Sequence, residues 1–358
     1  MVLLDNIAFE LQKAGGVSLV WRAVLDACQN DSSLNYKYLD SMKGKSNIFY
    51  PKKLKNTSII NDCDSRFLRR YRDVVVEEDI ELFHSSYFRI HANKKVKNIV
   101  TIHDFVYEKF DSGIRKYVHL WQKKRALKAA TAVICVSENT KQDLLSYHPW
   151  LDENKVRVIH NGVSSDFFPL EPSKKYSLPC KSPYLLYVGG RNSHKNFNAS
   201  LVLLTTKLAK ELGLKLVVIG GGGLSESELG QIESLQLSES VIHISNVDNS
   251  RLNGLYNFAY AFIYPSLYEG FGIPPIEAMA AGCPVICSNV SSIPEVVGNA
   301  GLMFDPVSPL DAEKYLLNLS DSEYRKSVIT KGVQRASLFS WEKTGQKTVD
   351  LYKEVLKC

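Results

Sequence analysis

Hydrophobic and polar positions follow two patterns that alternate along the chain. Short apolar runs rich in β-branched residues, typical of buried strands, are separated by longer stretches with the period of an amphipathic helix. Such alternation predicts β-α units and parallel sheets. The expected strands of the first half are residues 2–5, 79–84, 98–103, 132–137 and 156–160, with helices expected at 18–27 and 117–130.

Residues 160–183 interrupt this pattern with an Asn-Gly turn and four prolines among polar residues, the composition of a linker. A second alternating set follows. Its expected strands are 184–190, 214–223, 241–245, 261–266 and 283–288, and its expected helices are 196–212, 225–236, 249–259 and 274–282. The chain is therefore predicted to be an α/β protein with two Rossmann-like, doubly wound domains at 1–162 and 163–338, followed by an amphipathic helix within 339–358.

Composition narrows the class of protein. The 358 residues are 45% hydrophobic and 23% charged, as in ordinary globular proteins. The sequence has neither an apolar run long enough for a membrane span nor the features of a signal peptide at residue 1, so a cytoplasmic protein is expected. The seven cysteines are odd in number and scattered, which favours buried or incidental thiols over disulfides or a bound metal.

The net charge of +6 comes entirely from the first 165 residues, with basic clusters at 66–72 and 115–128. Such runs are most often solvated helix faces. The alternative is contact with an anionic membrane, whose attraction amounts to about 1 kcal/mol per basic residue near the surface. No motif for binding nucleic acid accompanies the charge, so a nucleic-acid partner is not expected.

The stretch 264–283, YPSLYEGFGIPPIEAMAAGC, joins a strand end to a glycine loop and a helix that opens with two prolines. A loop of this kind at the carboxyl end of a parallel strand suits an anionic ligand. Glu269 lies in the loop and Glu277 in the first turn of the expected helix. Two carboxylates suit hydroxyl donors, such as a ribose and a sugar, better than phosphate alone. The alternative is one capping glutamate and one solvated glutamate.

Two further loops follow expected strands. The loop 187–196, YVGGRNSHKN, places Arg191 and Lys195 beside a glycine turn, where cations would neutralise a diphosphate leaving group. Ordinary exposed loop cations fit this stretch equally well. The glycines at 220–223, which include Gly221, lower the side-chain barrier to a base or ribose. They lack the GxGxxG order, so a nicotinamide cofactor is not expected.

Two weaker candidates lie in the first half. Gly15 and Gly16 precede the helix expected at 18–27, where they either let the backbone approach a ligand or form a tight turn. His103 ends an expected strand, where it would either bind a substrate or serve the structure.

Taken together, these segments resemble glycosyltransferase family 4 of the GT-B fold over essentially the whole chain. Glu269 and Glu277 match the E-x7-E motif of that family, within the signature PSLYEGFGIPPIEAMAAGCPVI. Weaker matches occur in the right order: GGVS, TIHDF, VSENTKQDL, VIHNGVSSDFFP, YVGGRNSHKNF and the terminal FSW…Y helix. The resemblance implies two domains that face a cleft and a final helix that crosses back to pack on the N-terminal domain.

The resemblance also implies roles for the donor-domain residues. Glu277 would bind the ribose hydroxyls of the donor, and Glu269 the hydroxyls of the transferred sugar. Backbone N–H groups around Phe271, Gly272 and Ile273 would face the sugar and the phosphate.

Charged and N-terminal residues complete the implied site. Arg191 and Lys195 would neutralise the diphosphate, Gly15 and Gly16 would contribute from the other domain, and His103 would reach the donor sugar. In many relatives the segment between the arginine and the lysine is longer and often has an arginine just before the lysine. Here His194 takes that place, which makes Arg191 a weaker match than Lys195.

The implied activity is retaining transfer of a hexose from a nucleotide sugar, with no metal cofactor. The donor is expected to be GDP-mannose, by likeness to bacterial polysaccharide mannosyltransferases, and the acceptor a glycan or lipid-linked oligosaccharide at the inner face of the membrane. Front-face attack, with the leaving phosphate as base, gives Glu269 no role as nucleophile, unlike the paired carboxylates of retaining glycosidases. The alternatives are a UDP-sugar donor and a catalytically silent binding or scaffold module.

Overall fold

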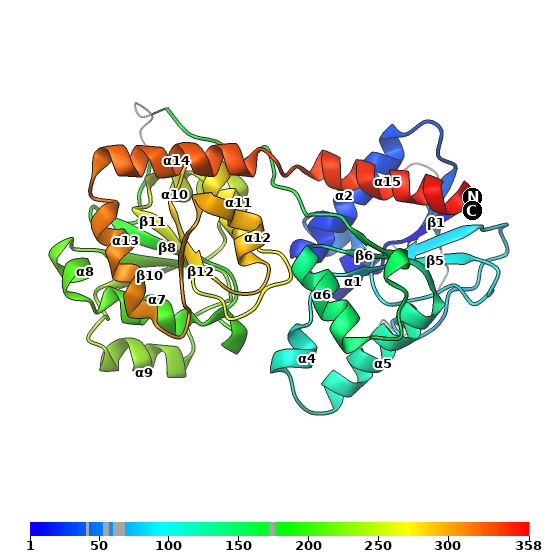
Figure 1. Ribbon diagram of the computed structural model, residues 1–358, viewed down its shortest axis with the longest axis horizontal. Coiled ribbons are helices and arrows are strands. Elements are labelled where there is room, and N and C mark those ends of the chain that lie inside the picture. The colour runs from blue at the N-terminus through cyan, green and yellow to red at the C-terminus, as the bar shows by residue number, and fades with distance from the viewer. Residues whose placement is uncertain (41–42, 53–56, 60–68, 172–175, 358) are drawn as a thin grey trace. The chain divides into compact units, whose positions relative to one another are not determined.

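The computed structural model describes residues 1–40, 43–52, 57–59, 69–171 and 176–357, and these form two compact units (Figure 1). The N-terminal unit comprises Met1–Gly162 together with Ser340–Cys358, and the C-terminal unit comprises Val163–Phe339. Parts of the basic cluster at 66–72 and of the linker at 160–183 lie outside the described residues, as do Cys63 and Cys358.

The described strands of the N-terminal unit form one parallel sheet in the order β3-β2-β1-β4-β5-β6-β7. The strands are β1 Val2–Asp5, β2 Tyr36–Asp40, β3 Thr57–Ile59, β4 Leu82–Ser85, β5 Lys97–Ile102, β6 Ala130–Cys135 and β7 Val156–Val158. The helices are α1 Ala8–Leu11, α2 Gly16–Asn30, α4 Val106–Phe110, α5 Ile114–Ala129 and α6 Glu138–Tyr147, with short 3-10 turns η1 Lys43–Ser46 and η2 Glu153–Lys155.

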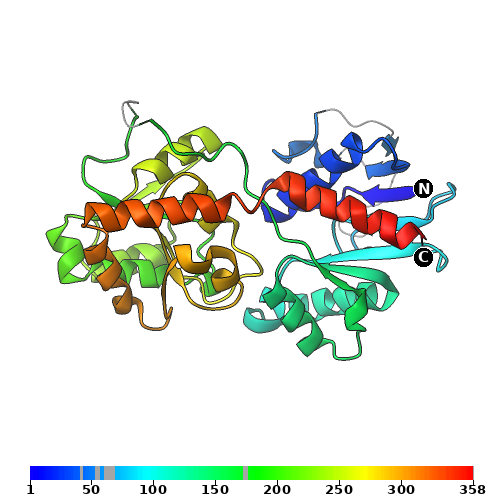
Figure 2. The ribbon, with the colours of Figure 1, turned by 45° about the horizontal axis from the view of Figure 1, so that its top comes forward.

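The last helix, α15 (Trp341–Lys357), belongs to the N-terminal unit, where it packs along α2 (Figure 2). A Cβ atom on Gly345 would lie 2.5 Å from the carbonyl oxygen of Ala23 and 2.6 Å from the Cβ of Ala27, so glycine permits this close approach. The Tyr352 hydroxyl lies 2.5 Å from Nδ1 of His84. The return of the final helix to the N-terminal domain is thereby confirmed.

The C-terminal unit contains a second parallel sheet in the order β10-β9-β8-β11-β12-β13. Its strands are β8 Tyr184–Val188, β9 Lys215–Ile219, β10 Val241–Ile244, β11 Ala261–Tyr264, β12 Val285–Ser288 and β13 Leu302–Phe304. Its helices are α7 Phe197–Leu204, α8 Lys207–Glu211, α9 Glu226–Ser234, α10 Asn249–Phe258, α11 Ile273–Ala280, α12 Ile293–Val297, α13 Glu313–Asn318 and α14 Ser322–Ala336, with 3-10 turns η3 Ser193–Lys195, η4 Gly298–Ala300 and η5 Pro309–Ala312.

Both faces of the second sheet are buried. In β8, Leu185 and Tyr187 enter one core cluster, whereas Tyr184 and Leu186 enter the other. Side chains of a strand point alternately to the two faces, so a strand covered on both sides is apolar at every position. This explains why the β8 sequence YLLYV reads as a continuous apolar run rather than an alternating one.

The two strand orders share the doubly wound topology in which the first strand lies between the second and the fourth. The connections on either side of that first strand run in opposite directions, and they leave a crevice at the carboxyl ends of the two central strands. This switch point lies between β1 and β4 in the N-terminal unit and between β8 and β11 in the C-terminal unit. The predicted fold class, two doubly wound α/β domains, is confirmed.

Some elements differ from the prediction. The helix expected at 196–212 is two helices, because the chain turns at Thr205 and Thr206. The Thr206 hydroxyl then accepts a hydrogen bond from the Ala209 amide and caps α8. Strands β2, β3 and β13 were not predicted: β2, YKYLD, mixes charged and apolar residues, and β3 and β13 are only three residues long.

Three further observations concern the described part of the chain. No helix there is both long and apolar enough to cross a membrane. Cys28, Cys135, Cys283 and Cys287 are buried free thiols, and Cys180 is a partly exposed one. Over the same residues, no group of three or more His, Cys, Asp or Glu side chains is placed to hold a metal ion.

Candidate functional site

The switch point of the C-terminal sheet brings together a cation and a carboxylate from two loops. Lys195 ends the turn η3 after β8, and Glu269 lies in the loop after β11. The Lys195 ammonium donates to both carboxylate oxygens of Glu269, at 2.7 and 2.9 Å. The side chains of Lys195 and Glu269 are 22% and 10% exposed, so the lysine is partly accessible and the carboxylate is nearly buried. The structure thus joins two residues that the sequence singled out separately.

The lysine loop is attached to the glutamate loop by hydrogen bonds from a side-chain amide and from the backbone. Asn196, in a left-handed conformation (φ 50°), donates its side-chain amide to the carbonyls of Pro265 and Pro306. The Leu267 amide donates to the His194 carbonyl at 2.7 Å. These bonds hold Lys195 against the loop that carries Glu269.

The loop around Glu269 is also held from the next strand along the sheet. The Glu269 amide donates to the Ser291 hydroxyl at 2.9 Å, and the Ser292 hydroxyl donates to the carbonyls of Glu269 (3.0 Å) and Phe271 (2.9 Å). Both serines follow β12, at the same edge of the sheet. Sequence reasoning missed both serines. The signal available in the sequence was a pair of serines in the loop after a buried strand, just as Glu269 lies in the loop after β11.

Helix α11 begins at the end of this loop. Gly272 has φ 105°, a conformation that favours glycine, and α11 starts at Ile273 with prolines in its first turn. The buried Phe271 and Gly272 precede a helix N-terminus, where free backbone N–H groups and the helix dipole favour an anion. Because the helix starts one residue earlier than predicted, Glu277 lies in its second turn rather than its first.

Glu277 is a carboxyl group of intermediate exposure beside the buried Tyr256. Burial raises the pKa of Glu277 to about 7, and the Tyr256 hydroxyl, which donates to it at 3.3 Å, offsets only part of that rise. No ion pair from a described lysine or arginine reaches this carboxylate. Glu277 therefore has capacity for further hydrogen-bond donors, which hydroxyl groups of a ligand would supply.

Arg191 holds the glycine loop after β9. Its guanidinium donates to the carbonyls of Gly220 (2.6 Å), Gly222 (3.1 Å) and Gly223 (2.7 Å), and it pairs with Glu228 at 2.7 Å. Gly220, Gly221 and Gly222 all have positive φ, and a Cβ on Gly221 would lie 2.7 Å from the guanidinium. In this structure Arg191 fixes the loop, and its direct contact with a diphosphate remains a prediction.

His103 lies in the N-terminal unit, one residue past the end of β5. It lines a pocket of about 290 Å³ with Arg70, Tyr87, Tyr107 and His119 among its other walls. Burial lowers the pKa of His103 to about 4; Asp104 opposes the shift and Lys123 adds to it. The imidazole is therefore neutral near pH 7, able to donate from one ring nitrogen and accept at the other.

Gly15 and Gly16 form the start of α2 in the same unit. Gly15 precedes the helix with φ 150°, and a Cβ there would lie 2.5 Å from the side-chain oxygen of Gln12. Gln12 and Asn47 both donate to the Ser18 hydroxyl at 2.8 Å, which fixes the entry to the helix. The structure places the two glycines at a helix N-terminus and leaves their contact with a donor as a prediction.

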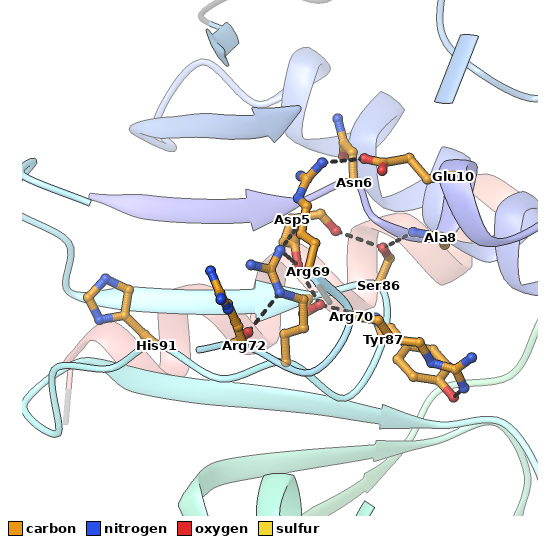
Figure 3. A network of polar contacts seen from close by, with 12 residues as sticks. Asp5, Asn6, Ala8, Glu10, Arg69, Arg70, Arg72, Ser86, Tyr87 and His91 are labelled. Carbon is orange, nitrogen blue, oxygen red and sulfur yellow. Dashed lines mark hydrogen bonds and ion pairs between the residues drawn. The ribbon is translucent and has the colours of Figure 1, made fainter. Parts of the chain in front are cut away.

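A buried polar network occupies the switch point of the N-terminal sheet (Figure 3). Asp5, the last residue of β1, pairs with Arg89 at 3.1 Å and accepts from the Ser85 hydroxyl at 2.8 Å. The Ser86 hydroxyl donates to the Asp5 carbonyl at 2.7 Å. Beside these residues, Arg69 pairs with Glu10 at 2.6 Å, also buried. Sequence reasoning missed this network, whose signal was the charge at the end of the apolar run VLLD.

The fold and these contacts define a class of protein. The C-terminal unit is a doubly wound domain whose switch point carries a lysine, two carboxylates, a glycine loop and a helix N-terminus. This set suits a ligand that has both phosphate and hydroxyl groups, as a nucleotide sugar has.

Comparison with known proteins identifies the family. The model for "Glycosyl transferases group 1" matches residues 171–335, and the model for "Glycosyltransferase Family 4" matches residues 45–167. O-antigen chain mannosyltransferase B of Escherichia coli is 29% identical over 80% of this chain and 76% of its own length. O-antigen chain mannosyltransferase RfbU of Salmonella typhimurium is 34% identical over 58% of this chain and 56% of its own length.

Solved structures show the same fold. Sucrose-phosphate synthase from Thermosynechococcus elongatus aligns over 99% of both chains with a TM-score of 0.76 at 19% identity. Anabaena Alr3699/HepE in complex with UDP-glucose aligns over 99% of both chains with a TM-score of 0.70 at 12% identity. The chain has the GT-B fold and belongs to glycosyltransferase family 4, whose members transfer a sugar from a nucleotide-sugar donor with retention of configuration.

Proposed function

We propose that this enzyme transfers mannose from GDP-mannose to a glycan or lipid-linked oligosaccharide during the synthesis of a surface polysaccharide. The sugar and the process are supported by the two O-antigen mannosyltransferases to which the chain is similar. The observation that carries the proposal is the Lys195–Glu269 pair at the switch point. The loop that holds Glu269 leads directly into helix α11, which carries Glu277.

In this proposal each residue of the C-terminal site meets one part of the donor. Glu277 accepts hydrogen bonds from the ribose hydroxyls, and Glu269 accepts them from the mannose. Lys195, already fixed by Glu269, neutralises the charge that grows on the diphosphate as the glycosidic bond breaks. Backbone N–H groups of residues 271–273 face the sugar and phosphate, and Gly221 lies by the base or ribose.

Glu269 acts here as a positioning carboxylate and not as a nucleophile. Both of its oxygens already accept hydrogen bonds from Lys195, which favours a role as acceptor toward a hydroxyl group. A covalent glycosyl-enzyme would require this carboxylate to leave its cation. We therefore propose front-face attack by the acceptor hydroxyl, with the leaving phosphate as base.

The N-terminal unit is proposed to bind the acceptor. Its pocket of about 290 Å³ has aromatic walls, including Tyr107 and His119 stacked at 4.0 Å between ring centroids, and aromatic faces suit the apolar faces of sugar rings. His103, as a neutral imidazole, and the N-terminus of α2 at Gly15 and Gly16 are proposed to contact the donor from this unit. A lipid-linked acceptor would place the enzyme at the inner face of the membrane, with the basic N-terminal unit in contact with anionic lipid.

A transfer assay tests the reaction. Purified enzyme would be incubated with labelled GDP-mannose, UDP-glucose and related donors, together with lipid-linked oligosaccharide from a polysaccharide-producing strain. The proposal requires transfer from GDP-mannose and an axial, retained configuration at the anomeric carbon by NMR. Inverted product, or transfer from none of these donors, would contradict it.

Two alternative functions lead to different expected results. A UDP-sugar donor is supported by the fold shared with HepE, which was solved with UDP-glucose. A silent binding or scaffold module is disfavoured because Lys195, Glu269, Glu277 and His103 are all present. A thermal-shift screen separates the three cases: GDP alone stabilises a GDP-sugar enzyme, UDP alone a UDP-sugar enzyme, and neither stabilises a module without donor binding. At about a hundred times its Kd, a ligand adds roughly 2.7 kcal/mol of stability.

A further inference from the structure

Helix α5 of the N-terminal unit exposes several large apolar side chains and buries polar ones beside Ala126 and Leu127. Ile114, Tyr117 and Trp121 are 79%, 69% and 53% exposed. On the opposite side, Gln122 and Lys123 are 0% and 1% exposed. A helix packed for stability alone shows the reverse arrangement. The outward face of α5 therefore requires an explanation that the fold of its own unit does not supply.

The inward polar face is anchored by two side chains, Lys123 and Gln122. The Lys123 ammonium pairs with Glu108 at 2.6 Å and donates to the Asp104 carbonyl at 3.0 Å. The Gln122 amide donates to the Arg70 carbonyl at 3.0 Å. These bonds fix the rotation of the helix about its axis, so Ile114, Tyr117 and Trp121 are held outward.

The outward residues form one continuous stripe, defined here as Ile114, Tyr117, Trp121, Lys124 and Lys128. At about 100° per residue these five positions fall within an arc of about 80°, and at 1.5 Å per residue they extend over about 21 Å. Both lysines are exposed. The stripe thus has an apolar, aromatic half toward the start of α5 and a cationic half toward its end.

The charge on helix α5 itself has one sign. Between Ile114 and Ala129, helix α5 carries six lysines and arginines and no aspartate or glutamate. Of the nearby carboxylates, Glu108 pairs with Lys123 and Asp73 pairs with Arg125 at 2.7 Å, whereas Asp111, before the helix, is exposed. The guanidinium of Arg125 also lies 5.1 Å from the Trp121 ring centroid. The surface therefore suits an anionic partner that accepts aromatic side chains.

We propose that the α5 stripe docks on the surface of an anionic lipid bilayer. Tryptophan and tyrosine prefer the boundary between headgroups and acyl chains, and lysines beside them gain about 1 kcal/mol each from an anionic surface. An in-plane helix with an apolar stripe and flanking cations is the arrangement by which a protein lies on a membrane without crossing it. Self-association through the same face would bring the lysines of two copies together, so a second copy is the poorer partner.

The placement of α5 within its unit supports this partner. Figures 1 and 2 show α5 on the outside of the N-terminal unit, on the other side of the sheet from α2 and α15. Its start follows α4, and α4 follows the strand end that leads to His103 and the pocket of about 290 Å³. A bilayer under the stripe would therefore lie beside the pocket proposed for the acceptor, in the same unit. This inference rests on the membrane part of the proposed function and not on its donor.

Vesicle sedimentation of the full chain tests the inference. The probes are vesicles of phosphatidylcholine alone and of phosphatidylcholine mixed with phosphatidylglycerol. Wild type is expected to sediment with the anionic vesicles only, and less as salt is added. Each of Lys124→Gln and Lys128→Gln should weaken partitioning about fivefold, the equivalent of the energy per basic residue. Trp121→Ser should weaken it about tenfold through lost apolar burial.

Matched controls lie in the C-terminal unit. Leu317 and Leu338 are as exposed as Trp121, and Lys207 is fully exposed, so Leu317→Ser, Leu338→Ser and Lys207→Gln should partition as wild type does. All substituted positions are on the surface, and an unchanged melting temperature would show that each variant is folded. Nucleotide binding by calorimetry should be the same in every variant.

Each outcome has one interpretation. Loss of vesicle binding in the stripe variants but not in the controls supports the inference. Equal binding by stripe variants and wild type overturns the assignment to α5 and leaves the proposed membrane contact standing. No vesicle binding by wild type overturns both, while nucleotide binding still reports on the donor site. A shift from dimer to monomer in the stripe variants without vesicles would overturn the inference in favour of self-association.

Discussion

The two sheets share the order of their first six strands, but the polar residues at their switch points differ in how far their hydrogen-bonding capacity is met. Between β1 and β4, the buried Asp5 carboxylate pairs with Arg89 and accepts a hydrogen bond from Ser85, and the Asp5 carbonyl accepts one from Ser86. The hydrogen-bonding capacity of Asp5 is therefore met within the unit. Between β8 and β11, the side chains of the Lys195–Glu269 pair are 22% and 10% exposed, and Glu277, in the helix that follows the Glu269 loop, has its pKa raised to about 7. One topology therefore carries a closed polar network in one unit and an open polar site in the other.

This difference separates a structural role from a binding role. A buried ion pair that is fully hydrogen-bonded fixes the loops around it and has no capacity left for a ligand. A carboxyl group that is desolvated but incompletely partnered is unfavourable until donors arrive, which is typical of a binding site. Substitution of Asp5 is therefore expected to lower mainly stability, whereas substitution of Lys195 or Glu277 is expected to lower mainly binding and activity.

The largest effect is expected from Asp5→Ala. The substitution leaves the Arg89 guanidinium buried without its carboxylate, which should cost about 3–5 kcal/mol of stability in the N-terminal unit. Hydrogen exchange of amides in β1 and β4 would measure the loss locally. Asp26→Ala is the control in the same unit: its partner Arg22 is exposed, and the change should cost less than about 0.5 kcal/mol. Both variants are expected to bind nucleotide with normal affinity. A large loss of affinity in Asp5→Ala would contradict a purely structural role for Asp5.

The next largest effect is expected from Lys195→Ala. Losing a cation aimed at the leaving diphosphate should lower kcat/KM about 10²–10³-fold, as removal of other transition-state charge stabilisers does. Because the Glu269 side chain is only 10% exposed, losing its cation should also lower the melting temperature, but by less than Asp5→Ala does, since Lys195 is 22% exposed. Lys207→Ala, at an exposed position of the same unit, serves as the control in both measurements. Unfolding without a specific loss of activity would assign Lys195 a structural role instead.

Donor binding is expected to depend on pH through Glu277. Hydroxyl groups donate to the ionised carboxylate, so binding favours deprotonation and becomes tighter as pH rises toward and past about 7. A nucleoside, which has no titrating phosphate, should bind about tenfold more tightly at about pH 8 than at about pH 6. Glu277→Gln keeps the shape without the charge and should show a flat profile. A sloping profile in that variant would locate the titrating group elsewhere.

The smallest effect is a difference between two neighbouring glycines. Gly221 and Gly222 both have positive φ, so alanine at either costs about 1 kcal/mol in backbone strain. Only at Gly221 would the new Cβ meet Arg191, and that guanidinium is held by carbonyls it would have to release. Gly221→Ala should therefore weaken nucleotide binding several-fold more than Gly222→Ala in calorimetry. Equal effects would show that Arg191 does not shape the loop for the ligand.

Much of the fold followed from local pattern. Strands such as β8 and β11 are apolar at every position because both faces are covered, and the helices between them have clear periods. Strand β2 was missed because Lys37 and Asp40 break the apolar run, and the helix expected at 196–212 is broken by a threonine cap that periodicity does not show. The return of α15 to the N-terminal unit was predicted from the family resemblance, not from periodicity.

The two switch points also differ in how far sequence could predict them. Glu269 and Glu277 lie in one short motif, and Lys195 follows a strand end, so their chemistry is visible locally. Asp5 and Arg89 are more than eighty positions apart, and their pairing depends on the parallel alignment of β1 with β4. The contacts of Arg191 could not be predicted either, because they depend on the positive φ values of three successive glycines.

The most direct test of the open site is a calorimetric titration of GDP and UDP into wild type and Glu277→Ala. One nucleotide, GDP under the proposed function, is expected to bind wild type with one site per chain. Glu277→Ala is expected to bind that nucleotide at least tenfold more weakly, and Asp5→Ala to bind it as wild type does. Equal affinity of wild type and Glu277→Ala, or binding of neither nucleotide, would contradict the assignment of the C-terminal switch point as the donor site.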